Sequence, residues 1–142
     1  MNRPSLPVIA AIGVAILLGG CSTPVGLKAF QRDPASQDQL PAGVDVPDNP
    51  KMENVRLLAN ADGVRYYAAQ AEESALTCLI KVPSDTTAMS VAGCGSSTVT
   101  GQILTISSAD ATATLVTDGF ETKELEGQGW RKIQENVLVG RR

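Results

Sequence analysis

Residues 51–142 are divided by turn-forming residues into short runs rich in Val, Ile and Thr, and this pattern limits the fold more than any other feature. β-branched residues favour strands, whereas Gly, Pro, Asp and Ser favour turns. The pattern predicts strands at 64–68, 75–82, 88–92, 102–107 and 111–117, and two further apolar runs, 130–133 and 137–139, finish the chain. The acidic segment 121–126 has room for one or two helical turns. We therefore expect a small antiparallel sheet of about six short strands with one or two short helices, an α+β fold leaning to all-β.

The segment just before this region carries a helical signal. Asn49-Pro50 is typical of a helix cap followed by a first-turn residue. Apolar residues then repeat at helical spacing, which predicts a short helix from about 50 to 60. A hairpin is the alternative, in which 56–60 pairs with 64–68 around the Asp62-Gly63 turn.

The start of the chain has the three-part layout of a secretory signal. Arg3 gives a positive start, an uncharged apolar run extends from Leu6 to Leu18, and two glycines precede Cys21. As a helix this run would span only about 20 Å, short of the roughly 30 Å hydrocarbon core of a bilayer. A permanent transmembrane helix is therefore the weaker interpretation. The sequence Leu18-Gly19-Gly20-Cys21 resembles the bacterial lipobox, in which the Cys thiol accepts a diacylglyceryl group.

The lipobox resemblance implies that residues 1–20 are a lipoprotein signal peptide and that the mature chain begins at a lipidated Cys21. Several acyl chains on one residue make a stable membrane anchor, because one chain alone binds only marginally. We therefore expect the protein on the outer face of the cytoplasmic membrane, held there by the covalent lipid and needing no other cofactor. An accidental thiol beside an ordinary cleavage site is the alternative.

Residues 21–50 have the composition of a tether. They contain five of the eight prolines of the chain together with four aspartates. Proline interrupts helices and strand ladders, and a flexible coil of this length has ends about 30 Å apart. We therefore expect a lipidated N-terminus and a Pro/Asp-rich linker, followed by a compact domain at 51–142. The alternative is that apolar residues of the segment dock on the domain and order part of it. These are Val25, Leu27, Phe30 and Leu40.

Cys78 and Cys94 are the two thiols that remain when Cys21 is assigned to the lipid. Outside the cytoplasm we expect them to form a disulfide, which would stabilise the domain by about 3 kcal/mol. Free buried thiols are the main alternative. A redox-active or metal-binding pair is disfavoured, because the two are not in a Cys-x-x-Cys motif and the chain has no His.

Composition excludes several classes of function. The chain has no His, which removes Ser-His-Asp and Cys-His catalysis. Its 12 basic and 15 acidic residues give a net charge of −3, which argues against nucleic acid as a partner. Motifs for phosphate or dinucleotide binding and for a nucleophile elbow are missing as well. Glu72 with Glu73, and Glu124 with Glu126, are better explained as solvated surface than as catalytic acids. We therefore expect neither enzyme activity nor a metal site.

Tyr66, Tyr67 and Trp130 are the aromatic candidates for contact with a ligand. Adjacent residues point to opposite faces of a strand, so at least one of the two tyrosines is expected in the core. Four cations near the end of the chain would suit anionic headgroups or wall polymers, although ordinary surface is the favoured explanation. They are Arg131, Lys132, Arg141 and Arg142.

A set of turn and strand-end segments carries a second resemblance. The segments are Asp62–Tyr67, Thr77–Ile80, Cys94, Leu115–Gly119 and Gly129-Trp130. They resemble small uncharacterised secreted or lipid-anchored proteins of actinobacterial type. The resemblance implies an envelope location and a Cys78–Cys94 disulfide, and it implies no activity. We expect a non-enzymatic envelope module that binds another protein or a wall component. A small-ligand or glycan receptor is the alternative, and an enzyme that relies on carboxylates alone is less favoured.

Overall fold

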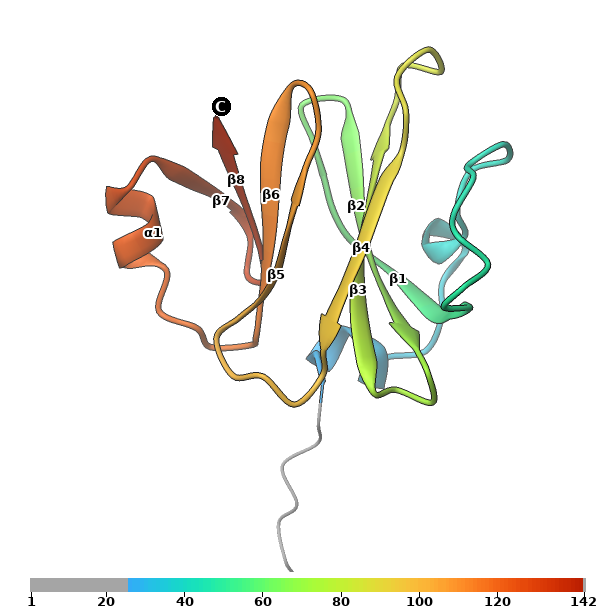
Figure 1. Cartoon of the computed structure of the whole chain (residues 1–142), viewed down its shortest axis with the longest axis horizontal. Coiled ribbons are helices and arrows are strands. Elements are labelled where there is room, and N and C mark those ends of the chain that lie inside the picture. Colours follow the sequence, from blue (N-terminus) through green and yellow to red (C-terminus); the bar gives the residue numbers. More distant parts are fainter. Residues whose placement is uncertain (1–25, 142) are drawn as a thin grey trace, which may run out of the picture.

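The computed structural model describes residues 26–141, most of which form two antiparallel sheets that pack face to face (Figure 1). The first sheet has the order β1-β2-β3-β4 and the second the order β5-β6-β8-β7. The first sheet consists of β1 (Met52–Ala61), β2 (Val64–Ala71), β3 (Leu76–Pro83) and β4 (Val91–Ser96). The second consists of β5 (Gln102–Ser107), β6 (Ala111–Val116), β7 (Trp130–Gln134) and β8 (Val137–Arg141), and the short helix α1 (Lys123–Gly127) precedes β7.

The predicted antiparallel, mostly β architecture is confirmed, but the predicted number of strands and sheets is not. One sheet of about six strands was expected, whereas the described part of the chain forms eight strands in two sheets. The undercount arises because the segment before residue 64 was assigned to a helix. The helix α1 lies at the acidic segment where a helical turn was expected.

The main core lies between the two sheets and is built by alternate residues of each strand. Tyr66 and Leu79 of the first sheet face Leu115 and Val137 of the second, and all four are buried. Successive side chains of a strand point to opposite faces, so one set of residues from each sheet fills the interior. Burying one such aliphatic side chain contributes about 1.5–3 kcal/mol, and the sandwich therefore depends on this alternation.

The other face of the first sheet is buried as well, beneath the residues that precede β1. The side chains on this face form a second apolar cluster, which includes Tyr67, Cys78, Ile80 and Val82. Leu40, Val44 and Val46 pack against that cluster from outside. Figure 1 shows the segment starting in blue at the bottom of the sandwich and then, in light blue to cyan, running beside β1 on the side away from the second sheet. We call residues 27–46 the N-terminal strap.

The strap corrects the expectation of a linker up to residue 50. Leu27 is fully buried in the main core, with Phe30 packed against the same cluster, as the docking alternative required. Two short 3-10 turns, η1 (Lys28–Gln31) and η2 (Ser36–Asp38), shape the segment. Burial of its apolar residues orders the segment despite its prolines and aspartates, because the outer face of the first sheet would otherwise be exposed to water. Val25 lies outside the described residues.

A buried carboxylate fastens the strap to β1. Asp38 accepts hydrogen bonds from both terminal nitrogens of Arg32 at 2.6 Å, and from the backbone N–H groups of Ala35 and Leu57 at 2.7 Å. These bonds, Arg32 first, hold the pKa of the Asp38 carboxyl well below its usual range despite its burial. Arg56 of β1 in turn donates to the backbone carbonyl of Arg32 at 3.0 and 3.3 Å.

The predicted helix at 50–60 is wrong, and the alternative hairpin is what the chain forms. β1 pairs antiparallel with β2, with Ala61 opposite Val64 across the Asp62-Gly63 turn. Both turn residues have positive φ, 53° and 72°, which two-residue hairpins favour. The pairing contains register shifts between Glu53 and Arg56 and between Leu57 and Ala59. Such bulges displace the alternation by one residue, which produced the spacing that resembled a helix.

β4 begins and ends later than predicted, at 91–96 instead of 88–92, and includes Gly93-Cys94-Gly95. The strand was expected to end before these glycines, because glycine favours turns. The glycines are instead extended and permit close approach of β5. A Cβ at Gly95 would lie 2.5 Å from the backbone oxygen of Ile103. Within β4, Cys94 lies opposite Cys78 of β3, and the two form the predicted disulfide, which is confirmed.

Candidate functional site

The sandwich has two ends with different chemistry. The entry end, at the bottom of Figure 1, holds Gly26 together with the turn 72–75 and the loop 97–101. The far end, at the top, holds the β1–β2 and β5–β6 turns and the loop 84–90. Each end carries one concave site formed by the described residues.

The far-end cleft, with a volume of about 910 Å³, opens where the two sheets separate. It is lined by Asp62, Asp110, Ala111, Gln128, Gly129, Arg131, Val139 and Gly140. Four separate parts of the chain supply these residues. They are the β1–β2 turn, the β5–β6 turn with the start of β6, the segment that leads from α1 into β7, and the end of β8. The carboxylates and the guanidinium thus come together only in the folded chain.

A buried ammonium group stands behind one wall of the cleft. Lys81 of β3 has a side chain that is only 3% exposed. It donates to the hydroxyl of Ser108 at 2.7 Å and to both carboxylate oxygens of Asp110 at 2.9 Å. Hydrogen bonds from Lys81 and then from Ser108 lower the pKa of Asp110 to about 2. Asp110 therefore stays ionised at physiological pH, and its ion pair with Lys81 joins the first sheet to the β5–β6 turn.

Tyr66 lies within electrostatic range of this charge cluster. It lies opposite Lys81 in the β2–β3 pairing and is 3% exposed. Burial raises the pKa of its phenol first, and the charges of Asp110 and Asp62 raise it further, whereas Arg131 lowers it. The phenol ring therefore packs in the core while its hydroxyl senses the charges that line the cleft.

An exposed ion pair closes the opposite side of the cleft. Arg131 of β7 donates to a carboxylate oxygen of Asp62 in the β1–β2 turn, with side chains 60% and 70% exposed. Arg131 lies opposite Val139 on the inner side of the second sheet. Its neighbour Trp130 points to the other side, where its ring would contact a Cβ at Gly140. The pair bridges the two sheets, although an exposed pair of this kind contributes only about 0–1 kcal/mol to stability.

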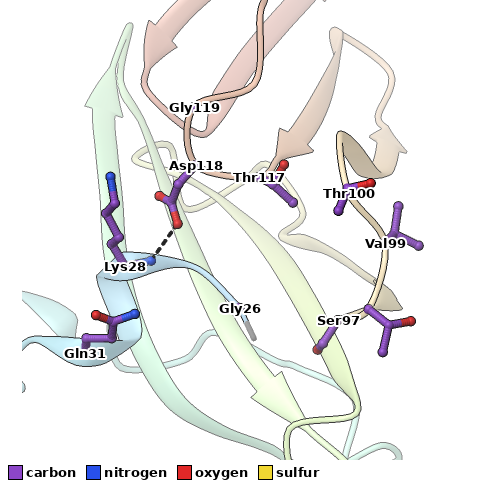
Figure 2. A pocket seen from close by; sticks show the side chains of 10 residues that line it. Gly26, Lys28, Gln31, Ser97, Val99, Thr100, Thr117, Asp118 and Gly119 are labelled. Carbon is purple, nitrogen blue, oxygen red and sulfur yellow. Dashed lines mark hydrogen bonds between the residues drawn. The ribbon is translucent and has the colours of Figure 1, made fainter. Parts of the chain in front are cut away.

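The entry-end pocket has a volume of about 600 Å³ and is rich in hydroxyl groups (Figure 2). Its lining includes Ser97, Thr98, Val99, Thr100 and Thr117, with Gly26, Lys28, Gln31, Asp118 and Gly119. The Asp118 carboxylate accepts from the backbone N–H of Lys28 at 2.8 Å and from the Asn136 amide at 3.1 Å. The acidic group here therefore serves mainly to hold the start of the strap against the β6–α1 connection.

The structure separates most of the residues that the sequence singled out for ligand contact. Tyr66 and Tyr67 face opposite sides of β2, as the alternation predicted, but both are buried, so neither can stack on a ligand from solution. Trp130 is half-buried on the outer side of the second sheet. Arg131 and Lys132 point to opposite sides of β7, and the side chains of Arg141 and Arg142 lie outside the described residues, as does the lipidation candidate Cys21.

Sequence reasoning did not bring Asp62, Lys81, Asp110 and Arg131 together. The available signal was Lys81, a single charge within an otherwise apolar strand run, which suggests a buried partner. Asp110 and Asp118 lie at opposite ends of the sandwich. Over residues 26–141 there is no cluster of three or more His, Cys, Asp or Glu side chains that could hold a metal ion.

Comparisons with known proteins add no relative to this picture. No protein family, no curated protein and no solved structure matches the chain. Within the described part of the chain, no helix is long and apolar enough to cross a membrane.

Proposed function

We propose that this protein is a lipid-anchored, extracytoplasmic binding module that presents its far-end cleft away from the membrane. The anchor is a diacylglyceryl group on Cys21, and the site of action is the outer face of the cytoplasmic membrane. One observation carries the orientation: the strap packs on the sandwich, so that the chain enters the described fold at the entry end.

The distance from the anchor to the fold follows from chain geometry. Cys21 precedes Gly26 by five residues. An extended chain spans at most about 3.6 Å per residue, so the entry end lies within about 18 Å of the acylated residue. β1 has ten residues, which corresponds to a length of about 33 Å along the sandwich. The far-end cleft is therefore held beyond the headgroup region, on the side open to soluble or wall-bound partners.

The chemistry of the cleft favours binding over catalysis. A carboxylate-dependent enzyme needs one carboxyl with a raised pKa to act as an acid. The pKa of Asp110 is instead lowered, and the Lys81 ammonium is committed to that carboxylate and to Ser108. These groups form a fixed polar surface with donors and acceptors in set positions, which suits recognition of a polar ligand.

The distribution of apolar surface supports a small or polar partner. Among the described residues the exposed large hydrophobic side chains are Met89, 85% exposed, and Val99, 39% exposed. They lie in different loops at opposite ends of the sandwich, so they form no continuous patch. Stable protein partners usually bury an apolar centre, and the second candidate function, a small-ligand receptor, therefore gains support from the cleft itself.

Mass spectrometry and membrane fractionation test the anchor. Cys21→Ala should remove the acyl mass and release the protein from membranes. Ser22→Ala, which alters the neighbouring residue and leaves the thiol in place, should remain acylated and membrane-bound. A Cys21→Ala protein that stays in the membrane fraction would show that something other than this lipid holds it, and the proposal would fail.

A further inference from the structure

The far-end cleft contains polar groups whose bonding capacity is only partly used. Arg131 makes its one hydrogen bond within the described chain through a terminal nitrogen to Asp62. A guanidinium has five N–H donors, so most of those on Arg131 remain available to a ligand. Planar guanidinium donors match a carboxylate in a two-point arrangement, which is the strongest recognition available at this site.

The same cleft offers unused acceptors close to that donor. One carboxylate oxygen of Asp62 bonds to Arg131, and the other has no partner among the described residues. Oδ1 of Asp110 accepts from Lys81 and from the Ser108 hydroxyl, whereas Oδ2 accepts from Lys81 alone, on a side chain that is 68% exposed.

Opposite charges therefore stand side by side in a concave site, and each is within reach of a small molecule. Asp62 and Asp110 supply the negative charges and Arg131 and Lys81 the positive ones, and of the two cations Arg131 is exposed whereas Lys81 is buried against Asp110. Because the Asp62–Arg131 pair is exposed and contributes little to folding, a ligand can replace either partner at small cost. Ligands with one charge would leave one side of the cleft unmatched.

We infer that the far-end cleft binds a small zwitterion, with the ligand carboxylate on Arg131 and its ammonium group on Asp62 and Asp110. Free amino acids and short peptides belong to this class. The cleft volume of about 910 Å³ is ample for a dipeptide. Three of the residues that line it, Gly129, Gly140 and Ala111, have a small side chain or none. This inference deepens the proposed binding role but does not depend on the lipid anchor.

The test is calorimetric titration of the purified full-length protein in detergent with the dipeptide Ala-Ala. We expect a dissociation constant below about 1 mM. N-acetyl-Ala-Ala-amide, which carries neither charge, should bind at least about ten-fold more weakly. Absence of binding by Ala-Ala up to about 10 mM, or equal binding of the blocked peptide, would overturn the inference.

Variants locate the site. Arg131→Gln and Asp62→Asn should each weaken Ala-Ala binding at least about ten-fold, because each removes one charged partner. Lys132→Gln is the matched control: it removes the same charge from the next residue of β7, which points to the other side of the sheet. Equal loss with Lys132→Gln would mean that general charge, not the cleft, attracts the peptide, and would refute the inference.

Amide NMR shifts on titration give an independent measure that also reports folding. The largest shifts should fall at Asp62, Asp110 and Gly129, with the β2–β3 core amides unchanged in the two cleft variants. Shifts concentrated at the entry-end pocket would contradict the assignment. A failed titration with Cys21 still acylated would reject the ligand class alone, whereas loss of acylation would reject the anchor alone.

Discussion

Replacing Asp38 by Asn tests whether one buried carboxylate holds the strap on the sandwich. The substitution keeps the size of the side chain but removes its charge and one acceptor oxygen. Asp38 now accepts four hydrogen bonds, two from Arg32 and two from backbone N–H groups of Ala35 and Leu57. An amide has a single acceptor oxygen, so part of this set must lose its partner.

The expected loss is large for a single atom change. Breaking a buried ion pair by removing one partner typically costs about 3–5 kcal/mol, because the other charge is left uncompensated. Arg32 is partly exposed and regains some water, which places the cost at the lower limit, about 3 kcal/mol. For a domain of this size that corresponds to a fall in melting temperature of about 10 °C.

Urea unfolding followed by circular dichroism measures this cost. Asp33→Asn is the matched control, since it removes the same charge from an exposed carboxylate in the same strap and should change the free energy of unfolding by less than about 0.5 kcal/mol. Amide exchange of the strap should accelerate in Asp38→Asn before exchange of β2 and β3 does. A loss below about 1 kcal/mol, or equal losses in the two variants, would refute the reasoning.

The same carboxylate predicts a pH dependence of definite sign. The pKa of Asp38 is held well below its usual range in the folded protein, whereas the unfolded chain has the ordinary value of about 3.9. Its contribution is therefore complete above about pH 5 and is lost as the pH falls, because the unfolded state takes up the proton first. The stability difference between wild type and Asp38→Asn should shrink by about 1.4 kcal/mol per pH unit below about pH 4. A difference that stays constant down to pH 2 would contradict this.

Three further substitutions follow from the packing, each measured by urea unfolding. Cys78→Ser should lower the free energy of unfolding by about 3 kcal/mol through loss of a cross-link between residues 16 apart, and an unchanged value would speak against a stabilising disulfide. Gly95→Ala should cost about 2 kcal/mol because its Cβ would lie 2.5 Å from the oxygen of Ile103, whereas Gly127→Ala, with no atom within 4 Å, should be neutral; equal effects would contradict the close approach. Tyr67→Phe should be neutral or stabilise by up to about 1 kcal/mol, since its buried hydroxyl has no hydrogen-bond partner in the described structure, and a clear loss would reveal a partner.

Most strands that follow residue 64 were predictable, β4 being the exception, because their side chains alternate over most of their length. β3 is the clearest example: Cys78, Ile80 and Val82 face one side and Lys81 the other, as its sequence indicates. The β5–β6 hairpin likewise pairs regularly from Leu104 to Ser107 and has a turn of small polar residues. In each case local preference and burial favour the same structure, which is the condition under which sequence reasoning succeeds.

The failures occurred where tertiary packing overrides the local pattern. Bulges in β1 broke its alternation, and Gly93 and Gly95 gave β4 the appearance of a turn, although their lack of side chains serves contact with β5. The strap looked like a linker because its prolines are a local signal, whereas the apolar surface that Leu27 covers is formed by strands far along the chain. The far-end cleft was unpredictable for the same reason, since hairpin turns and β7 meet only after both sheets have formed.

The strap connects the three parts of the proposed function, which are the lipid anchor, the orientation of the domain and the binding cleft. A free linker of the length first expected would let the domain tumble about its anchor, and no face would be presented consistently. With Leu27 in the main core and Asp38 bonded to β1, the start of the described chain is instead fixed to the sandwich. The Lys81–Asp110 and Asp62–Arg131 pairs then lie at the opposite end, where the two sheets part. Under the proposed function, ion pairing at the strap sets the direction in which the cleft points, and the charges within the cleft set which ligands it binds.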